Sequence, residues 1–227
     1  MSHILATPKF YRNLEDDTHC LQVCIKMAIE SLEPYCSFSQ EEIDSMTGFI
    51  TGKATWPMKS YVEIYNLGYD VRVIENFNYP DFANDPDKYL RKEFGNDIAE
   101  QVCQESDIAS AVRDTHELLE IKDLILSTKL PILKDIAELL SRGYLLICNV
   151  NHNLLLGESG YEGHFVLLYE INSNAVTLHD PGPPAKQSLC VSIKSFEDAW
   201  SSPNEMARII FAIGSCKLRE KIKQLTA

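Results

Sequence analysis

The first strong pattern along the chain is an apolar stripe with the spacing of a helix. From Thr18 onward, apolar side chains recur every three or four residues, at Leu21, Cys24, Ile25, Ala28, Ile29 and Leu32. This period places them on one face of a helix, which Pro34 ends. Asp16, Asp17 and Thr18 are suitable N-cap residues just before the stripe. The pattern therefore predicts a buried helix with Cys20 in its first turn.

Two more helices and a strand are predicted in the part of the chain that follows. Ser39 begins a capping-box sequence with Glu42, and the helix that it starts stops near Gly48. Residues 57–67 form another helical pattern, and residues 69–74 alternate between apolar and polar side chains. A helix followed by a strand is the expected structure here.

A long polar and acidic block then occupies residues 79–128. Its pattern is mostly helical, with helices expected over 86–94, 97–103 and 106–126. Little of it alternates as a strand does. We expect a helical insertion or subdomain, whose surface can contact a protein partner.

The second half of the chain has the pattern of a sheet. A helix from Pro131 to Gly143 precedes an apolar run over 144–150, which has the length of a buried strand. Two further strands, 164–171 and 175–180, are separated by a short polar segment that marks a hairpin. The sequence predicts an α+β fold, with N-terminal helices packed on a C-terminal antiparallel sheet.

The composition fits one globular unit. The 227 residues are 45% hydrophobic and 24% charged, which suits a single domain over 1–227. The net charge of -12 would repel a phosphate backbone, so nucleic acid is not an expected partner. Neither a secretory signal nor an apolar run of roughly 20 residues is found, so no membrane contact is expected. Seven scattered cysteines, an odd number, predict free thiols in a reducing cytoplasm.

Three residues have the chemistry of a thiol enzyme. Such an enzyme needs a nucleophilic sulfur, a base beside it and a group that orients the base. Cys20 lies at a helix start, where the positive end of the helix dipole lowers a thiol pKa. His164 opens a strand directly after the glycine-containing loop 157–163, and Asp180 ends the next strand.

The predicted hairpin brings the last two of these residues together. With a turn centred on Ser173, Asp180 falls opposite Phe165 or Val166 and close to His164. Paired residues lie about 5 Å apart, so the carboxylate can reach the imidazole. There it would hold the ring and favour the imidazolium, which stabilises a thiolate.

Three motifs of the chain form a recognisable set. They are Cys20-Leu21-Gln22-Val23-Cys24-Ile25-Lys26-Met27, Gly163-His164-Phe165-Val166-Leu167-Leu168-Tyr169 and His179-Asp180-Pro181. The set resembles the bacteriocin-processing (double-glycine) papain-like cysteine peptidases and their soluble stand-alone relatives. Those proteins have a Cys-Gly-x-Ala-Cys-x-x-Met helix, a Gly-His-Phe-Val strand and an Asp-Pro strand end. The resemblance implies a papain-like fold with Cys20 as nucleophile, His164 as base and Asp180 as orienting residue.

Two positions depart from the family pattern. Leu21 stands where the family has glycine after the nucleophile, which alters the close backbone approach that glycine permits. The family also has an oxyanion-hole glutamine about six residues before the cysteine. Asn13 is the candidate for that role here, in a segment similar to the Tyr-Arg-Gln of some relatives, while Gln22 lies on the wrong side of Cys20. Loss of one oxyanion donor costs roughly 100 to 1,000-fold in rate.

Other polar residues near these motifs have simpler interpretations. Cys24 continues the apolar stripe and is expected in the core. Cys20, Cys24 and His19 offer too few ligands for tetrahedral zinc, so no metal is expected. His179 points to the opposite face of its strand from Asp180, at the surface or behind the site. His152 has no context that assigns it a role.

The sequence therefore predicts a cysteine peptidase that acts on a peptide or protein substrate without a cofactor. It would cleave a peptide or amide bond through a thioester at Cys20. Two alternatives stay open: a papain-like module that has lost catalysis and binds a protein through 79–128, and a thiol enzyme that transfers an acyl or peptidyl group. The missing glycine and glutamine favour the first, whereas the intact Cys20, His164 and Asp180 favour an enzyme.

Overall fold

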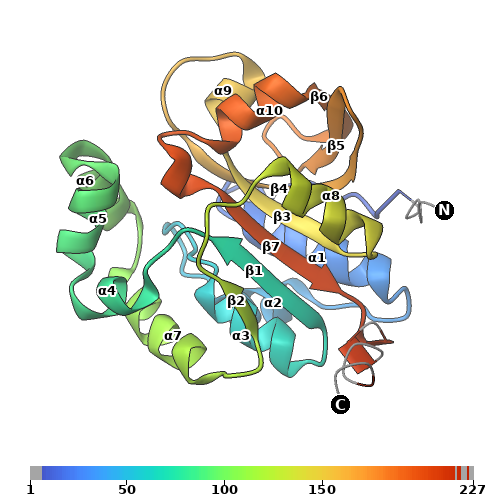
Figure 1. The fold of residues 1–227 in the computed structure, drawn as a ribbon, viewed down its shortest axis with the longest axis horizontal. Coiled ribbons are helices and arrows are strands. Elements are labelled where there is room, and N and C mark those ends of the chain that lie inside the picture. Colours follow the sequence, from blue (N-terminus) through green and yellow to red (C-terminus); the bar gives the residue numbers. More distant parts are fainter. Residues whose placement is uncertain (1–6, 218, 221–223, 225–227) are drawn as a thin grey trace.

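The computed structural model describes residues 7–217, 219, 220 and 224 (Figure 1). Residues 1–6, part of the stretch considered for a secretory signal, lie outside the described residues. The helices of the described chain are α1 (Cys20–Leu32), α2 (Gln40–Thr47), α3 (Met58–Asn66), α4 (Tyr79–Asn84), α5 (Pro86–Phe94), α6 (Asn96–Glu105), α7 (Ile108–Glu120), α8 (Leu133–Ser141), α9 (His152–Leu156), α10 (Ile193–Trp200) and the short 3-10 helix η1 (Glu205–Ala207). None of these helices in the described residues is long and apolar enough to cross a membrane.

The strands form one mixed sheet. They are β1 (Asp70–Glu75), β2 (Ile125–Ser127), β3 (Leu145–Asn151), β4 (Gly163–Ile171), β5 (Ala175–Asp180), β6 (Lys186–Ser192) and β7 (Ile209–Gly214). The sheet has seven strands in the order β2-β1-β7-β3-β4-β5-β6, and neighbours are antiparallel except for β1 and β2. The predicted α+β class is confirmed.

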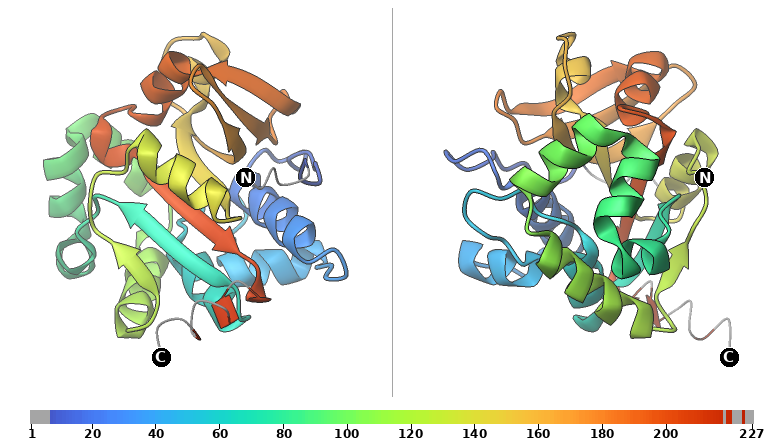
Figure 2. Two further views of the ribbon diagram at one scale, coloured as in Figure 1. Left: turned by 45° about the vertical axis from the view of Figure 1, so that its right-hand side comes forward. Right: turned by 90° about the vertical axis from the view of Figure 1, so that its left-hand side faces the viewer.

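The expectation of a purely antiparallel, C-terminal sheet is wrong. β1, from the N-terminal half, is an interior strand between β2 and β7. It pairs with β2 in parallel, and parallel neighbours need a crossover connection of a dozen or more residues. The helices α4 to α7 of the polar block supply that crossover, and they lie together beside this end of the sheet (Figure 1, Figure 2).

The third helix expected in the block ends earlier than its pattern indicated. α7 stops at Glu120, and Ile125–Ser127 form β2 instead of the end of a helix. These three residues pair with Arg72–Ile74 of β1. A three-residue edge strand has too few positions to show alternation, so the partner strand determines its structure.

Helices cover both faces of the sheet. On one face α1 and α3 pack on β1, β3, β4 and β7, with Ile25 and Phe211 in the core between them. On the other face α8 and α10 pack against strands β3 to β6, with Ile136 and Trp200 in that core. In Figure 1, α8 lies in front of the sheet and α1 lies behind it. The sheet is therefore the middle layer of three.

The helix that carries the predicted nucleophile begins at Cys20 itself. Its buried side includes most of the predicted apolar stripe, from Leu21 to Ile29. The residue before it, His19, occupies the N-cap position and makes no side-chain capping bond, so the acidic and threonine residues suggested as caps are not the cap. The first backbone N–H groups of a helix have no intrahelical partner, so Cys20 lies among donors that the helix itself does not use.

Phe211 tests the contribution of the central strand to stability. Its side chain is fully buried on β7, and its ring centroid lies 4.8 Å from that of Tyr61. We expect Phe211→Ala to lower the free energy of unfolding by about 3–5 kcal/mol, measured by urea denaturation, because it leaves a cavity. Leu119→Ala, on the exposed side of α7, is the control and should change it by less than about 0.5 kcal/mol. Similar losses in the two variants would contradict the assignment of Phe211 to the core.

Candidate active site

The structure brings Cys20, His164 and Asp180 together at one end of the sheet. His164 is the second residue of β4, and Asp180 is the last residue of β5. Between these strands Leu167 pairs with His179 and Leu168 with Leu178, the register that a turn centred on Ser173 predicts. Nearer the turn the register is shifted by one residue, with Glu170 opposite Thr177, because of an irregularity between Leu168 and Glu170. The Nε2 atom of His164 lies 2.9 Å from Oδ1 of Asp180.

Asp180 is a fully buried carboxylate that accepts three hydrogen bonds. Oδ1 accepts from the His164 ring and, at 2.9 Å, from the backbone N–H of Gly182. Oδ2 accepts at 3.1 Å from Nε2 of His152. Burial opposes the negative charge, but the bonds from His152 and His164 outweigh it and hold the pKa of Asp180 well below its ordinary value. The carboxylate is therefore ionised at neutral pH.

Cys20 and His164 favour each other's charged forms. Burial alone would raise the pKa of the Cys20 thiol, but the charge of His164 and a hydrogen bond with it lower that pKa overall. Burial likewise opposes the imidazolium, but the Cys20 charge and the bond to Asp180 raise the pKa of His164 to about 10. Because Nε2 serves Asp180, Nδ1 is the ring nitrogen left for the thiol. Each group therefore favours the charged form of the other, the thiolate of Cys20 and the imidazolium of His164.

His152 is a member of the site that sequence reasoning missed. It follows β3 directly, and its ring stacks on that of His164 with centroids 4.1 Å apart and planes 22° apart. It is buried, and it shares Asp180 with His164. The signal that places it is strand pairing, since Asn151 of β3 lies opposite Gly163 of β4. The eleven-residue segment 152–162 is not a tight turn, so the sequence alone did not give this register.

His152, His164 and Asp180 are also residue types that bind metal ions, and their ligand atoms lie within 4.8 Å of one another. The two rings are nearly parallel, and each Nε2 points to a different oxygen of the carboxylate at hydrogen-bond distance. Direct hydrogen bonds thus account for the whole arrangement. The three side chains fit a carboxylate shared by two imidazoles better than ligands aimed at one central ion.

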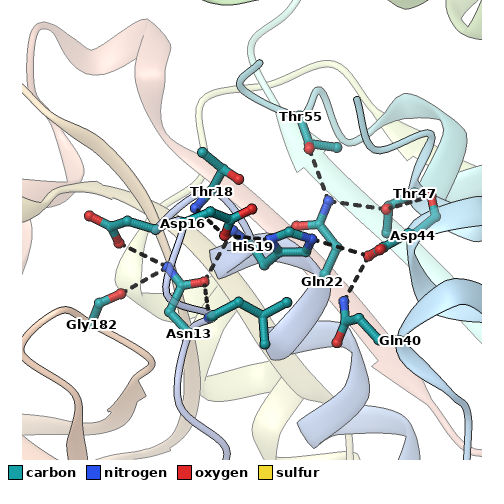
Figure 3. A network of polar contacts seen from close by, with 12 residues as sticks. Asn13, Asp16, Thr18, His19, Gln22, Gln40, Asp44, Thr47, Thr55 and Gly182 are labelled. Atoms are coloured by element: carbon teal, nitrogen blue, oxygen red, sulfur yellow. Dashed lines mark hydrogen bonds and ion pairs between the residues drawn. The ribbon is translucent and has the colours of Figure 1, made fainter. Parts of the chain in front are cut away.

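Asn13, the candidate oxyanion donor, holds the start of α1 against the end of β5 (Figure 3). Its Nδ2 group donates to the carbonyl of Gly182 at 2.9 Å and to Asp17 at 3.1 Å. Its Oδ1 accepts from the backbone N–H groups of Leu14 and His19. Both amide hydrogens are thus used within the protein, and the oxyanion role of Asn13 stays a prediction that this arrangement does not support.

The other side of α1 is held by His19 and Gln22 (Figure 3). The His19 ring contacts Asp16 at 2.9 Å and Asp44 of α2 at 3.4 Å. The Gln22 amide is fully buried and donates to the hydroxyls of Thr47 and Thr55 at 3.1 and 2.9 Å. Gln22 therefore fixes the 47–55 segment beside Cys20 and does not turn toward the thiol.

Cys20 is half-buried and lines a cavity of about 250 Å³, which we call the thiol cavity. Its lining also includes Thr18, Thr55, Gly163 and Phe165. Charged side chains also border it, namely Asp17, Lys53 and Glu105. A substrate carbonyl can thus approach the thiol from this cavity.

The remaining histidine and cysteine near the motifs are structural. His179 is fully buried, so the surface position considered for it is wrong: its Nε2 donates to the Pro8 carbonyl at 3.0 Å and its Nδ1 accepts from Ser188 N–H at 2.9 Å. Cys24 is buried as expected, and its thiol donates to the Phe165 carbonyl at 3.4 Å. Burial raises the pKa of Cys24 well above its ordinary value, so it competes poorly as a nucleophile.

No model of a known protein family matches the chain, and no curated protein sequence matches it either. The interpretation of the site therefore depends on its geometry and electrostatics.

Alkylation of Cys20 by iodoacetamide as a function of pH tests the ion pair. Because the pKa of Cys20 is lowered, we expect Cys20 to react faster than the other cysteines at about pH 6, where ordinary thiols are protonated. His164→Ala removes the opposing charge and leaves burial, so the pKa rises and the rate at that pH falls on the order of 100-fold. Peptide mass spectrometry follows each of the seven cysteines.

The control for this measurement is His116→Ala, on the exposed side of α7, which should leave the rate unchanged. If the exposed Cys36 and Cys190 were alkylated at the same rate as Cys20 at this pH, the result would contradict an activated thiolate.

His152→Ala tests whether the second imidazole supports Asp180. The substitution leaves a buried carboxylate oxygen without its donor, so we expect the free energy of unfolding to fall by about 1–3 kcal/mol. His152→Gln keeps an amide donor and should lose less. In the Asp180→Asn background His152→Ala should lower the free energy of unfolding by less, because the carboxylate charge that accepts the His152 hydrogen bond is absent. Equal losses in both backgrounds would exclude a direct interaction.

Proposed function

We propose that the protein is a papain-like cysteine peptidase, a thiol hydrolase that uses Cys20, His164 and Asp180. The observation that carries the proposal is the geometry of the three residues: Cys20 begins α1, and His164 lies 2.9 Å from the buried Asp180 carboxylate. The directions of the pKa shifts of Cys20 and His164 support it. The half-buried sulfur borders a cavity that can admit a substrate. The sequence motifs support the same assignment of roles.

The reaction follows from these positions. The Cys20 thiolate attacks the carbonyl carbon of a peptide or amide bond, forming a C–S bond and an oxyanion. The oxyanion collapses, the C–N bond breaks, and the amine leaves with the proton of the His164 imidazolium. Water then attacks the thioester with His164 as base, which releases the acid and restores the thiolate and imidazolium. Asp180 holds the ring throughout, and no step requires a cofactor.

The oxyanion has two donors beside the thiol that do not involve Asn13. The backbone N–H of Cys20 is at the first position of α1, where helix donors are unpaired. Thr18 lines the thiol cavity with a buried hydroxyl, for which the carboxylate of Asp16 is a competing partner. A hydroxyl two residues before Cys20 can serve the oxyanion when a substrate is bound.

The substrate and the setting are proposed more broadly. We take the substrate to be a peptide or protein, and the seven free thiols suit a reducing cytoplasm. The alternative of a protein-binding module without catalysis has one specific observation in its favour, namely that both amide hydrogens of Asn13 are already donated. Transfer to an amine instead of water would use the same thioester, so the test includes both outcomes.

Incubation with a synthetic peptide library tests the proposal, with products and any acyl group on Cys20 followed by mass spectrometry. We expect cleavage products from the native protein and none from Cys20→Ala. Thr18→Val should lower turnover by about 100 to 1,000-fold through loss of an oxyanion donor. It should leave alkylation by iodoacetamide unchanged, because that reaction forms no oxyanion.

Added glycinamide separates hydrolysis from transfer, since a transferase would attach it to the acyl product. A protein whose Cys20 is alkylated selectively but never acylated or turned over by any peptide would be a binding module instead of an enzyme.

A further inference from the structure

A second, larger cavity adjoins the thiol cavity. It has a volume of about 310 Å³, and we call it the apolar cavity. Ala54, Thr55, Glu105, Gly163 and Phe165 line both cavities, so the two share a wall. The apolar cavity lies between the sheet and the crossover helices, and its apolar lining includes Trp56, Phe77, Leu90, Phe94, Ile98 and Met206.

A carboxylate without a cation lies in the wall of this apolar cavity. Glu75, the last residue of β1, is 3% exposed and lines the cavity. The hydroxyls of Tyr61 and Tyr79 both donate to its Oε1 atom. No Lys, Arg or His of the described residues lies within ion-pair distance of it, and its Oε2 atom has no hydrogen bond among them.

Such a group is costly unless something else compensates its charge. A buried carboxylate without a cation disfavours ionisation, and burial raises the pKa of Glu75 to about 7 although the two tyrosine hydroxyls oppose the shift. An apolar residue of similar size would avoid that cost in a position that served packing alone. The carboxylate instead borders open space, where a ligand can reach it.

The rest of the lining favours a positive charge as well. Glu105 and Glu162 also line the cavity, whereas none of its described lining residues is Lys or Arg. Trp56, Phe77 and Phe94 contribute aromatic rings, whose faces attract cations. A ligand with an apolar body and a cationic end satisfies both parts of this lining.

We propose that the apolar cavity binds a long basic group of the substrate, such as a lysine side chain, with its cationic end at Glu75. This inference rests on the proposed function, because it takes the group in the apolar cavity to belong to the molecule whose carbonyl meets Cys20. The aliphatic stem lies among the aromatic and aliphatic residues, and the ammonium pairs with the carboxylate. The crossover helices α5 and α6 thereby form the specificity wall of the site.

Binding of hexylamine and of 1-hexanol to Cys20→Ala protein, followed by isothermal titration calorimetry, tests this inference without the thiol. The two probes share the apolar stem and differ in the charge at its end. We expect hexylamine to bind about tenfold or more tightly than 1-hexanol. Glu75→Gln, added to this background, keeps the shape and the tyrosine bonds, so it should abolish that preference and leave 1-hexanol binding unchanged.

Two further variants locate the effect. Glu170→Gln removes the same charge from the exposed part of β4 and should leave both affinities as they were. Val102→Trp, in the cavity wall on α6, should remove binding of both probes. Equal affinities for the two probes, a preference for 1-hexanol, or a preference for hexylamine that persists in Glu75→Gln would overturn the proposal. Circular dichroism shows whether Glu75→Gln is folded. If it is not, the proposal is decided by the affinities of the two probes for Cys20→Ala protein and by their loss in Val102→Trp.

Failure of the proposed function is a separate result. It would appear in native protein as unselective alkylation of the cysteines, or as selective alkylation of Cys20 without any acylation or peptide turnover. Amine binding, in contrast, is measured in protein that lacks the thiol.

Discussion

The buried charge of Asp180 is the constraint on which the rest of the site depends. An ionised carboxylate with no exposed surface needs donors on both oxygens, and it receives them from three separate segments. His164 comes from the start of β4, His152 from the start of α9 directly after β3, and the N–H of Gly182 from the loop after β5. The three strand ends are therefore held in one arrangement. Gly182 is also required there, because its φ is +72° and a Cβ would lie 2.1 Å from the Ala185 nitrogen.

Cys20 is fixed near this charge through the backbone of the N-terminal segment. The backbone N–H of Asn13 donates to the Pro181 carbonyl, its side chain donates to the Gly182 carbonyl, and its oxygen accepts from His19 N–H. One asparagine thus joins the residue before Cys20 to the loop after Asp180. This role explains a polar residue at position 13 without catalysis, and it explains why the amide cannot also face a substrate in this arrangement.

The positions in the site that depend on local sequence patterns could be predicted from the sequence. The positions that depend on pairing between distant strands could not. The helix start at Cys20 follows from the apolar stripe, and the contact between His164 and Asp180 follows from a three-residue hairpin segment. His152 depends on the pairing of β3 with β4 across a long connection, which no local signal fixes. The place of β1 inside the sheet depends likewise on β7, which lies more than 130 residues later. The expectations ended before β6, α10 and β7, although the Ser192 cap and the apolar run of β7 are visible in the sequence.

Burying His152, His164 and Asp180 together costs free energy, and this cost argues against the alternative of a module that only binds a protein partner. Two imidazoles and a carboxylate are buried side by side, and apolar residues of the same volume would serve packing at lower cost. A binding surface on the crossover helices would need neither these residues nor a thiol with a lowered pKa. The crossover itself follows from topology, because two parallel strands require it. Its helices also form a wall of the cavity that adjoins the thiol cavity, so a connection that the sheet demands also shapes the surroundings of Cys20.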